Sequence, residues 1–119
     1  MAPKIKNLLS YWISQLKLLD WNISVVLAEE EGELENEGSL GECNAESANR
    51  SAVITLLDPL IFKEKYRREG KRTFEETFVH ELLHLTLWDF LPSERVKRNL
   101  FEAAVDAIAI ALVTNKYRK

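Results

Sequence analysis

The chain has 119 residues, 46 % of them hydrophobic, a formal net charge of −3 and a sequence pI of about 5.5. This length supports one domain with its own core, which we expect to span residues 1–119. The nearly balanced charge favours neither nucleic acid nor an anionic membrane as a partner. The one cysteine, Cys43, cannot form an internal disulfide, and no apolar run is long enough to cross a bilayer, so we expect a cytoplasmic protein.

The first third of the chain predicts a helix, a strand and a polar connection. Apolar residues recur with a period of about 3.6 from Ile5 to Leu19, behind a proline suited to a first helical turn. The period then changes to two from Trp21 to Leu27, which predicts a half-buried strand. Residues 29–42 include seven glutamates and no basic residue, so we expect a solvated connection there.

The middle of the chain predicts two more strands and a second helix. A weak strand is predicted from Gly41 to Ser47. A stronger one, from Ser51 to Leu57, carries apolar residues on both sides, as in a strand covered on both faces. Asp58 followed by proline predicts a helix start, with the end near Gly70. The basic side of this helix alternates with glutamates, which favours a solvated face over a nucleic-acid surface.

Two further helices are predicted at the C-terminal end. Thr73 and Glu76 have the spacing of a capping box, so a helix should begin there and stop before Pro92. Ser93 is the expected cap of the last helix, which should run to about Asn115 and pack closely through its alanines. We therefore expect an α+β fold in which a small, twisted, mostly antiparallel sheet packs on a backing helix and on the two C-terminal helices.

The first of these two helices carries the motif His80-Glu81-Leu82-Leu83-His84. Histidines four residues apart lie on one helix face and can share a Zn²⁺ ion, with Glu81 beside them as a base. The alternative is an amphipathic helix whose two histidines are ordinary polar surface or core groups.

A third ligand would have to be a carboxylate, because the chain has no third histidine and no second cysteine. Glu102 is the best candidate, since the loop at Pro92 lets the last helix fold back beside the motif. Asp106, one turn later, could accept a hydrogen bond from a zinc-binding histidine and fix its orientation. The alternative is an ordinary surface pairing of Glu102 with Arg98 or Lys97.

His80-Glu81-Leu82-Leu83-His84 followed by Glu102-Ala103-Ala104-Val105-Asp106 resembles the motif pair of the gluzincin (thermolysin-like) zinc metallopeptidases, in a compact form similar to the minigluzincins. The resemblance implies a zincin-like fold with His80, His84 and Glu102 as zinc ligands. It also implies that Asp106 orients one of the zinc-binding histidines. It also implies that an extended peptide binds along the strand from Ser51 to Leu57 or along a neighbouring edge. The group that stabilises the oxyanion stays open, with four candidates: Tyr66, Arg95, Arg98 and Tyr117.

The expected reaction is hydrolysis of a peptide bond by a metal-activated water, with Glu81 as general base and then as general acid. The substrate would be a peptide, or an unfolded or regulatory protein. One alternative is a regulatory peptidase of the kind that cuts phage-type repressors. Another is a non-enzymatic binding module in which the metal only joins two helices, although a structural zinc normally has four protein ligands. A further alternative is that Cys43 caps the zinc as a thiolate.

Overall fold

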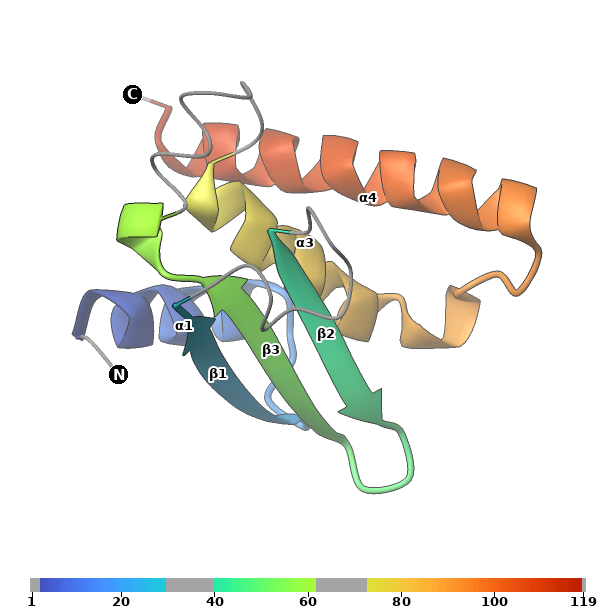
Figure 1. Ribbon diagram of the computed structural model, residues 1–119, viewed down its shortest axis with the longest axis horizontal. Coiled ribbons are helices and arrows are strands. Elements are labelled where there is room, and N and C mark those ends of the chain that lie inside the picture. Colours follow the sequence, from blue (N-terminus) through green and yellow to red (C-terminus); the bar gives the residue numbers. More distant parts are fainter. Residues whose placement is uncertain (1–2, 30–39, 62–72, 119) are drawn as a thin grey trace.

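The computed structural model describes residues 3–29, 40–61 and 73–118 (Figure 1), and these form an α+β fold. Its elements are, in order, α1 (Pro3–Gln15), β1 (Asn22–Ala28), β2 (Gly41–Glu46), β3 (Ser51–Leu57), α3 (Phe74–Thr86), the 3-10 helix η2 (Trp88–Phe90) and α4 (Arg95–Lys116). The helix expected after Asp58 begins there, because the Asp58 Oδ1 atom accepts a hydrogen bond of 3.0 Å from the backbone of Leu60. The remaining residues predicted for that helix, including its basic side, and most of the acidic connection lie outside the described residues.

The sheet has three strands in the order β1-β3-β2. β2 and β3 form an antiparallel hairpin, but β1 and β3 run parallel, so the expectation of a mostly antiparallel sheet is wrong for one of the two pairings. β3 is the most apolar strand, and the central position gives it two hydrogen-bonded neighbours. The sheet is therefore mixed, with β1 and β2 at its two edges in the described part of the chain.

The two faces of the sheet have different environments. Ala52, Ile54 and Leu56 of β3 are buried in one cluster with residues of α1 and α3, which shows that both helices pack on the same face. On the opposite face Val53 is 41 % exposed and Val26 of β1 is 47 % exposed. The prediction that β3 is covered on both faces therefore holds only at the end of the strand, where Leu57 is fully buried in a second cluster with Ala28 and Leu40. Along the rest of β3 the helices bury the side to which the even-numbered residues point.

The end of α1 differs from the sequence prediction by one turn. Lys17 has a positive φ of 58°, and the backbone N–H groups of Lys17 and Leu18 bond to the carbonyls of Ser14 and Ile13. This is the Schellman arrangement, in which a left-handed residue ends a helix. The reversal turns Leu18 into the core, while Leu19, which was expected on the apolar face, is 80 % exposed.

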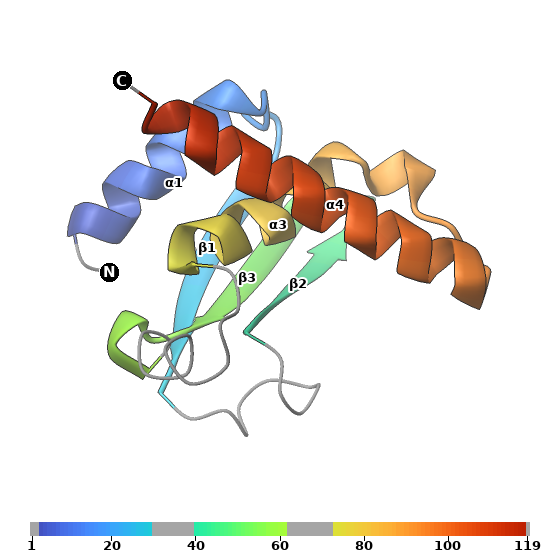
Figure 2. The same ribbon diagram turned by 90° about the horizontal axis from the view of Figure 1, so that it is seen from above.

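A polar cluster joins α1, the start of α3 and the end of α4. The Glu75 carboxylate accepts hydrogen bonds from Trp12 Nε1 at 2.8 Å, from Lys116 Nζ at 2.7 Å and from the Tyr117 hydroxyl. The Lys116 ammonium also lies over the ring of Tyr11, 4.3 Å from its centroid. Because this cluster fixes the C-terminal end of α4 against the first turn of α3, it sets which residues of the two helices face each other (Figure 2).

The two C-terminal helices begin differently. The predicted capping box of α3 is confirmed, with both reciprocal hydrogen bonds between Thr73 and Glu76 present. The prediction for α4 was one residue off, since Glu94 occupies the cap position, without a side-chain hydrogen bond, in place of Ser93.

The packing of α4 is narrower than expected. Its buried residues are Val105, Ala109 and Val113, which recur every four residues and form a single stripe. Four of the alanines expected at the interface are exposed: Ala103, Ala104, Ala107 and Ala111. No helix within the described residues has the length and apolarity needed to cross a membrane.

Candidate metal centre

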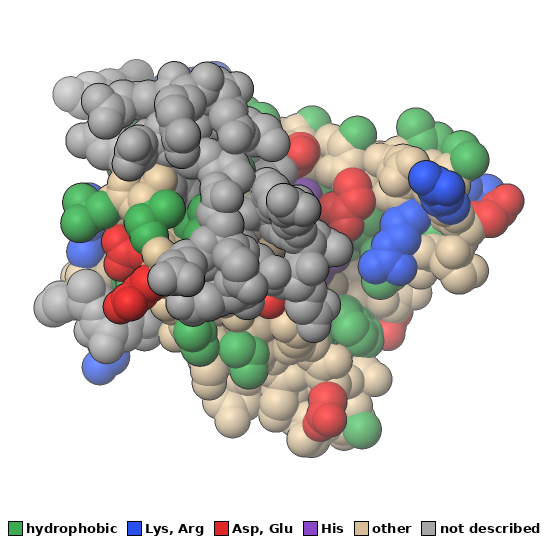
Figure 3. Space-filling view, viewed as in Figure 1, with side chains coloured by type: hydrophobic (Ala, Val, Ile, Leu, Met, Phe, Trp, Pro, Cys, Tyr) green, Lys and Arg blue, Asp and Glu red, His purple; other side chains and the backbone are tan. Residues whose placement is uncertain are grey.

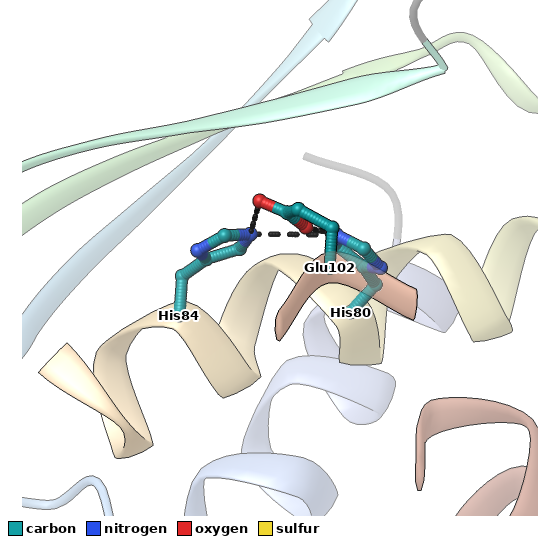
Figure 4. A group of neighbouring side chains, drawn as sticks. All are labelled: His80, His84 and Glu102. Carbon is teal, nitrogen blue, oxygen red and sulfur yellow. Dashed lines mark hydrogen bonds and ion pairs between the residues drawn. The ribbon is translucent and has the colours of Figure 1, made fainter. Parts of the chain in front are cut away.

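The two histidines of α3 and a glutamate of α4 converge on one point. α3 lies between the sheet and α4, and its third turn faces the middle of α4 (Figures 1 and 4). The Nε2 atoms of His80 and His84 are 3.3 Å apart. The Glu102 oxygens lie 3.0 Å from His80 Nε2 and 3.2 Å from His84 Nε2. Each of the three residues offers one ligand atom within 4.8 Å of the other two, so the structure brings together the three residues predicted to hold a metal.

Asp106 lies behind His80. Its Oδ1 atom is 2.6 Å from His80 Nδ1, on the side of the ring that points away from Glu102. A carboxylate in this position accepts a hydrogen bond from Nδ1–H, so the proton that His80 would give up on binding a cation is the one on Nε2. Asp106 therefore sets the tautomer in which His80 can bind a cation.

Glu102 is held by the histidines and not by its neighbours on α4. Hydrogen bonds from His80 and then His84 lower the pKa of the Glu102 carboxyl far below its ordinary value, although partial burial acts in the opposite direction. Lys97 pairs instead with Glu94 at 3.3 Å. The alternative in which Glu102 forms a surface pair with Arg98 or Lys97 is therefore wrong.

The donor set of this cluster fits a divalent cation. Two imidazole nitrogens and a carboxylate oxygen are electron-pair donors, and bringing three of them together is unfavourable unless a proton or a cation lies among them. His80 is 6 % exposed and His84 is partly buried, so little water is available to offset this repulsion. A borderline-soft ion such as Zn²⁺ takes this combination of nitrogen and oxygen ligands, whereas Mg²⁺ and Ca²⁺ prefer oxygen alone.

Glu81 lies beside the cluster, on the side nearer the sheet. It is 5 % exposed, and its carboxylate is close enough to Cys43 of β2 to affect that thiol. Burial, and then the charge of Glu81, raise the pKa of Cys43 from 9.0 to about 12. Without a metal ion Cys43 is therefore a neutral thiol at physiological pH, and it is not among the residues that converge on the cluster.

Gly41 is a residue of the site region that sequence reasoning missed. A Cβ atom at this position would lie 2.8 Å from Leu56 Cδ2 and 3.2 Å from Thr77 Cγ2. The absence of a side chain therefore allows the start of β2 to approach α3 one turn before His80 and Glu81. The glycine stood out in the sequence only as part of an acidic, glycine-containing connection.

The positions of the four candidate residues exclude one of them as the group that stabilises the oxyanion. Tyr117 is bound to Glu75, and it follows Glu102 by fifteen residues, which is about 22 Å along a helix. It is therefore too far from the cluster to act there. Tyr66 lies outside the described residues, and Arg95 and Arg98 are on the same helix as Glu102.

Comparison of the chain with protein-family models, with curated proteins and with solved structures gave no significant match. The function has to be inferred from the geometry and chemistry of the site.

Proposed function

We propose that the protein is a zinc metallopeptidase of the gluzincin type, with a zincin-like arrangement of α3, α4 and the sheet. The observation that carries the proposal is the convergence of ligand atoms from His80, His84 and Glu102 within 4.8 Å. In addition, Asp106 Oδ1 lies 2.6 Å from His80 Nδ1. Three ligands leave a coordination position for a reactant, whereas a structural zinc site is normally closed by four. Within the described residues the cluster offers three.

The residues around the cluster supply the remaining parts of a hydrolytic site. A zinc ion bound there would polarise the scissile carbonyl and lower the pKa of a water molecule towards ~7. Glu81 neighbours the histidines on α3 but is not among the three converging residues, so it can take a proton from the attacking water. It can then donate that proton to the leaving amine. His80 stays in the binding tautomer because Asp106 holds Nδ1.

The sheet supplies a surface on which an extended peptide could bind. β3 is paired on both sides and cannot accept another strand, which rules out the first of the two positions expected for the substrate. β2 is an edge strand in the described part, and it packs against α3, the helix that carries the histidines. A peptide aligned with β2 by backbone hydrogen bonds would have its scissile bond near Glu81.

The test compares wild-type protein with Glu81→Gln, purified without a histidine tag and loaded with zinc. Both should bind one zinc per chain, because Glu81 is not one of the converging residues. Cleavage of a mixed peptide library or an unfolded protein should fall by at least 10²–10⁴-fold in the variant, the range for a lost general acid or base.

The same experiment separates the enzyme from a metal-joined binding module. Such a module has no cleavage to lose, so Glu81→Gln could change only its stability, because Glu81 is buried. A matched control is Glu76→Gln, which removes the same charge from the same helix at a position facing the Thr73 cap. Cleavage that survives Glu81→Gln undiminished would refute the proposed mechanism.

A further inference from the structure

Two arginines of α4 lie on the same side of the helix as the candidate ligand Glu102. Arg98 precedes Glu102 by four residues and Arg95 precedes it by seven, spacings that place side chains on one helix face. Arg98 has the position of an ordinary ion-pair partner for Glu102, but both Glu102 oxygens are directed at the histidines. Within the described part of the chain neither arginine forms an ion pair, and both are exposed.

These arginines make a local positive region in a chain of net charge −3. Figure 3 shows basic side chains over the N-terminal end of α4, next to the acidic side chains around the histidines. Lys97, the third basic residue of this turn, projects about 100° away from Arg98 around the helix and pairs with Glu94 at 3.3 Å. The two arginines that form no ion pair within the described residues therefore lie on the side of α4 that carries Glu102.

Distance separates this region from the reacting atoms. The Cα atom of Arg98 lies about 6 Å along the helix from that of Glu102, and helical side chains tilt towards the N-terminus, away from the cluster. The guanidinium group is then on the order of 10 Å from the ligand atoms, whereas an oxyanion donor must come within roughly 2.7–3.1 Å. An extended peptide advances about 3.3 Å per residue, so 10 Å corresponds to about three residues.

We propose that Arg98, with Arg95 one turn further on, binds an acidic side chain of the peptide substrate two or three residues from the cleaved bond. This inference rests on the proposed function, because it places the peptide at the metal cluster. A guanidinium group donates two parallel hydrogen bonds to a carboxylate, which gives orientation as well as attraction. The two arginines are thus specificity-determining residues, and the substrate class is acidic peptides.

The test measures binding separately from cleavage, by using zinc-loaded Glu81→Gln protein as the background. The ligands are peptides of one sequence, acetylated and amidated at their ends, with Asp, Ala or Lys placed in turn at each position. We expect the best Asp peptide to bind about 3- to 5-fold more tightly than its Ala counterpart, as fits a charge-assisted pair at an exposed site. The Lys peptide should bind most weakly of the three.

Three variants then assign the preference to its source. Arg98→Gln should reduce the preference for Asp to less than 2-fold, and Arg98→Glu should reverse it in favour of Lys. Lys97→Gln removes the same charge from the same turn on the other side of the helix, and it should leave the preference unchanged. Both residues are exposed, so the melting temperatures should stay within about 2 °C of the background protein, which is roughly half a kcal/mol.

The outcomes distinguish this inference from the proposed function. Equal binding of the Asp, Ala and Lys peptides, or an acidic preference that Lys97→Gln removes as fully as Arg98→Gln does, would overturn the arginine subsite even if wild-type protein cleaves peptides. A preference for Asp that depends on Arg98, in a protein whose wild type cleaves no peptide, would support the subsite and overturn the peptidase. Binding of no peptide by the zinc-loaded protein would overturn both.

Discussion

Replacement of Asp106 by Asn tests whether the cluster is organised to bind a metal. The side chain of Asn has nearly the same shape and can still accept a hydrogen bond from His80 Nδ1, so the 2.6 Å contact can persist without its negative charge. Loss of a carboxylate behind a metal-binding histidine typically weakens metal binding by about 10- to 100-fold, or about 1.4–2.7 kcal/mol. Asp106 is partly exposed, which favours the lower half of that range.

The same loss should be visible in thermal stability. A ligand present at about 1,000 times its Kd stabilises a protein by about 4.1 kcal/mol, and a 30-fold weaker affinity at the same zinc concentration leaves about 2 kcal/mol. For a chain of this size 1 kcal/mol corresponds to roughly 4 °C. The zinc-dependent rise in Tm should therefore be about 8 °C smaller in Asp106→Asn than in the wild type.

The assay combines competition against a zinc chelator of known affinity with melting curves recorded with zinc and with excess chelator. Glu102→Gln is the comparison variant and should be affected more strongly, because Glu102 is one of the three converging residues. If zinc affinity in Asp106→Asn stays within 2-fold of the wild type and the zinc-dependent rise in Tm is unchanged, His80 is not oriented by Asp106. Equal small effects at both positions would refute the metal cluster itself.

Two further predictions concern groups with shifted pKa values. The folded state raises the pKa of Cys43 from 9.0 to about 12, so its labelling by iodoacetamide at pH 8 should be roughly 10³-fold slower in folded than in guanidinium-unfolded protein. For the same reason the free energy of unfolding should fall as the pH rises above about 9. Labelling rates of the folded and unfolded protein within 10-fold of each other would contradict this prediction. Burial, the largest influence on Glu75, raises the pKa of its carboxyl, but the hydrogen bonds from Lys116, Tyr117 and Trp12 together leave it below its ordinary value of 4.5. Its contribution to stability is therefore present above about pH 4.5 and is lost as the pH falls through the lower folded-state pKa. In urea unfolding at pH 7, Glu75→Gln should cost about 1–3 kcal/mol, and its difference from wild type should shrink in acid; a difference independent of pH would argue against an ionised Glu75 in this cluster.

Local sequence was sufficient to predict the parts of the site that lie within one helix. Thr73 and Glu76 start α3 by hydrogen bonds across three residues, and the spacing of His80 and His84 follows from the helical repeat. These relations depend only on neighbouring residues. Glu102 could also be selected, because an acid in an otherwise apolar helix needs a compensating partner and the chain has few other metal ligands.

The sequence failed where a choice depended on distant partners. The alternation of apolar residues predicted three strands but could not decide whether β1 pairs with β2 or with β3, because both pairings bury the same faces. Likewise, the apolar period of α1 continued through Leu19, and only the left-handed turn at Lys17 directed Leu18 into the core instead. The alanines of α4 indicated a broad interface, but a single helical neighbour buries only one stripe.

The amino-acid sequence by itself determined which residues of this protein can bind a metal and on which helices they lie. Only the tertiary structure decided that they meet, because the meeting depends on how α4 is positioned along α3. That position is held by Lys116 and Tyr117 on Glu75, about four turns along α4 from Glu102, and by the stripe from Val105 to Val113. The approach of β2 to Glu81 was likewise decided in three dimensions, by the space that Gly41 leaves beside Thr77. Contacts of this kind join residues far apart in the chain, and their free energy depends on shapes that no local pattern records.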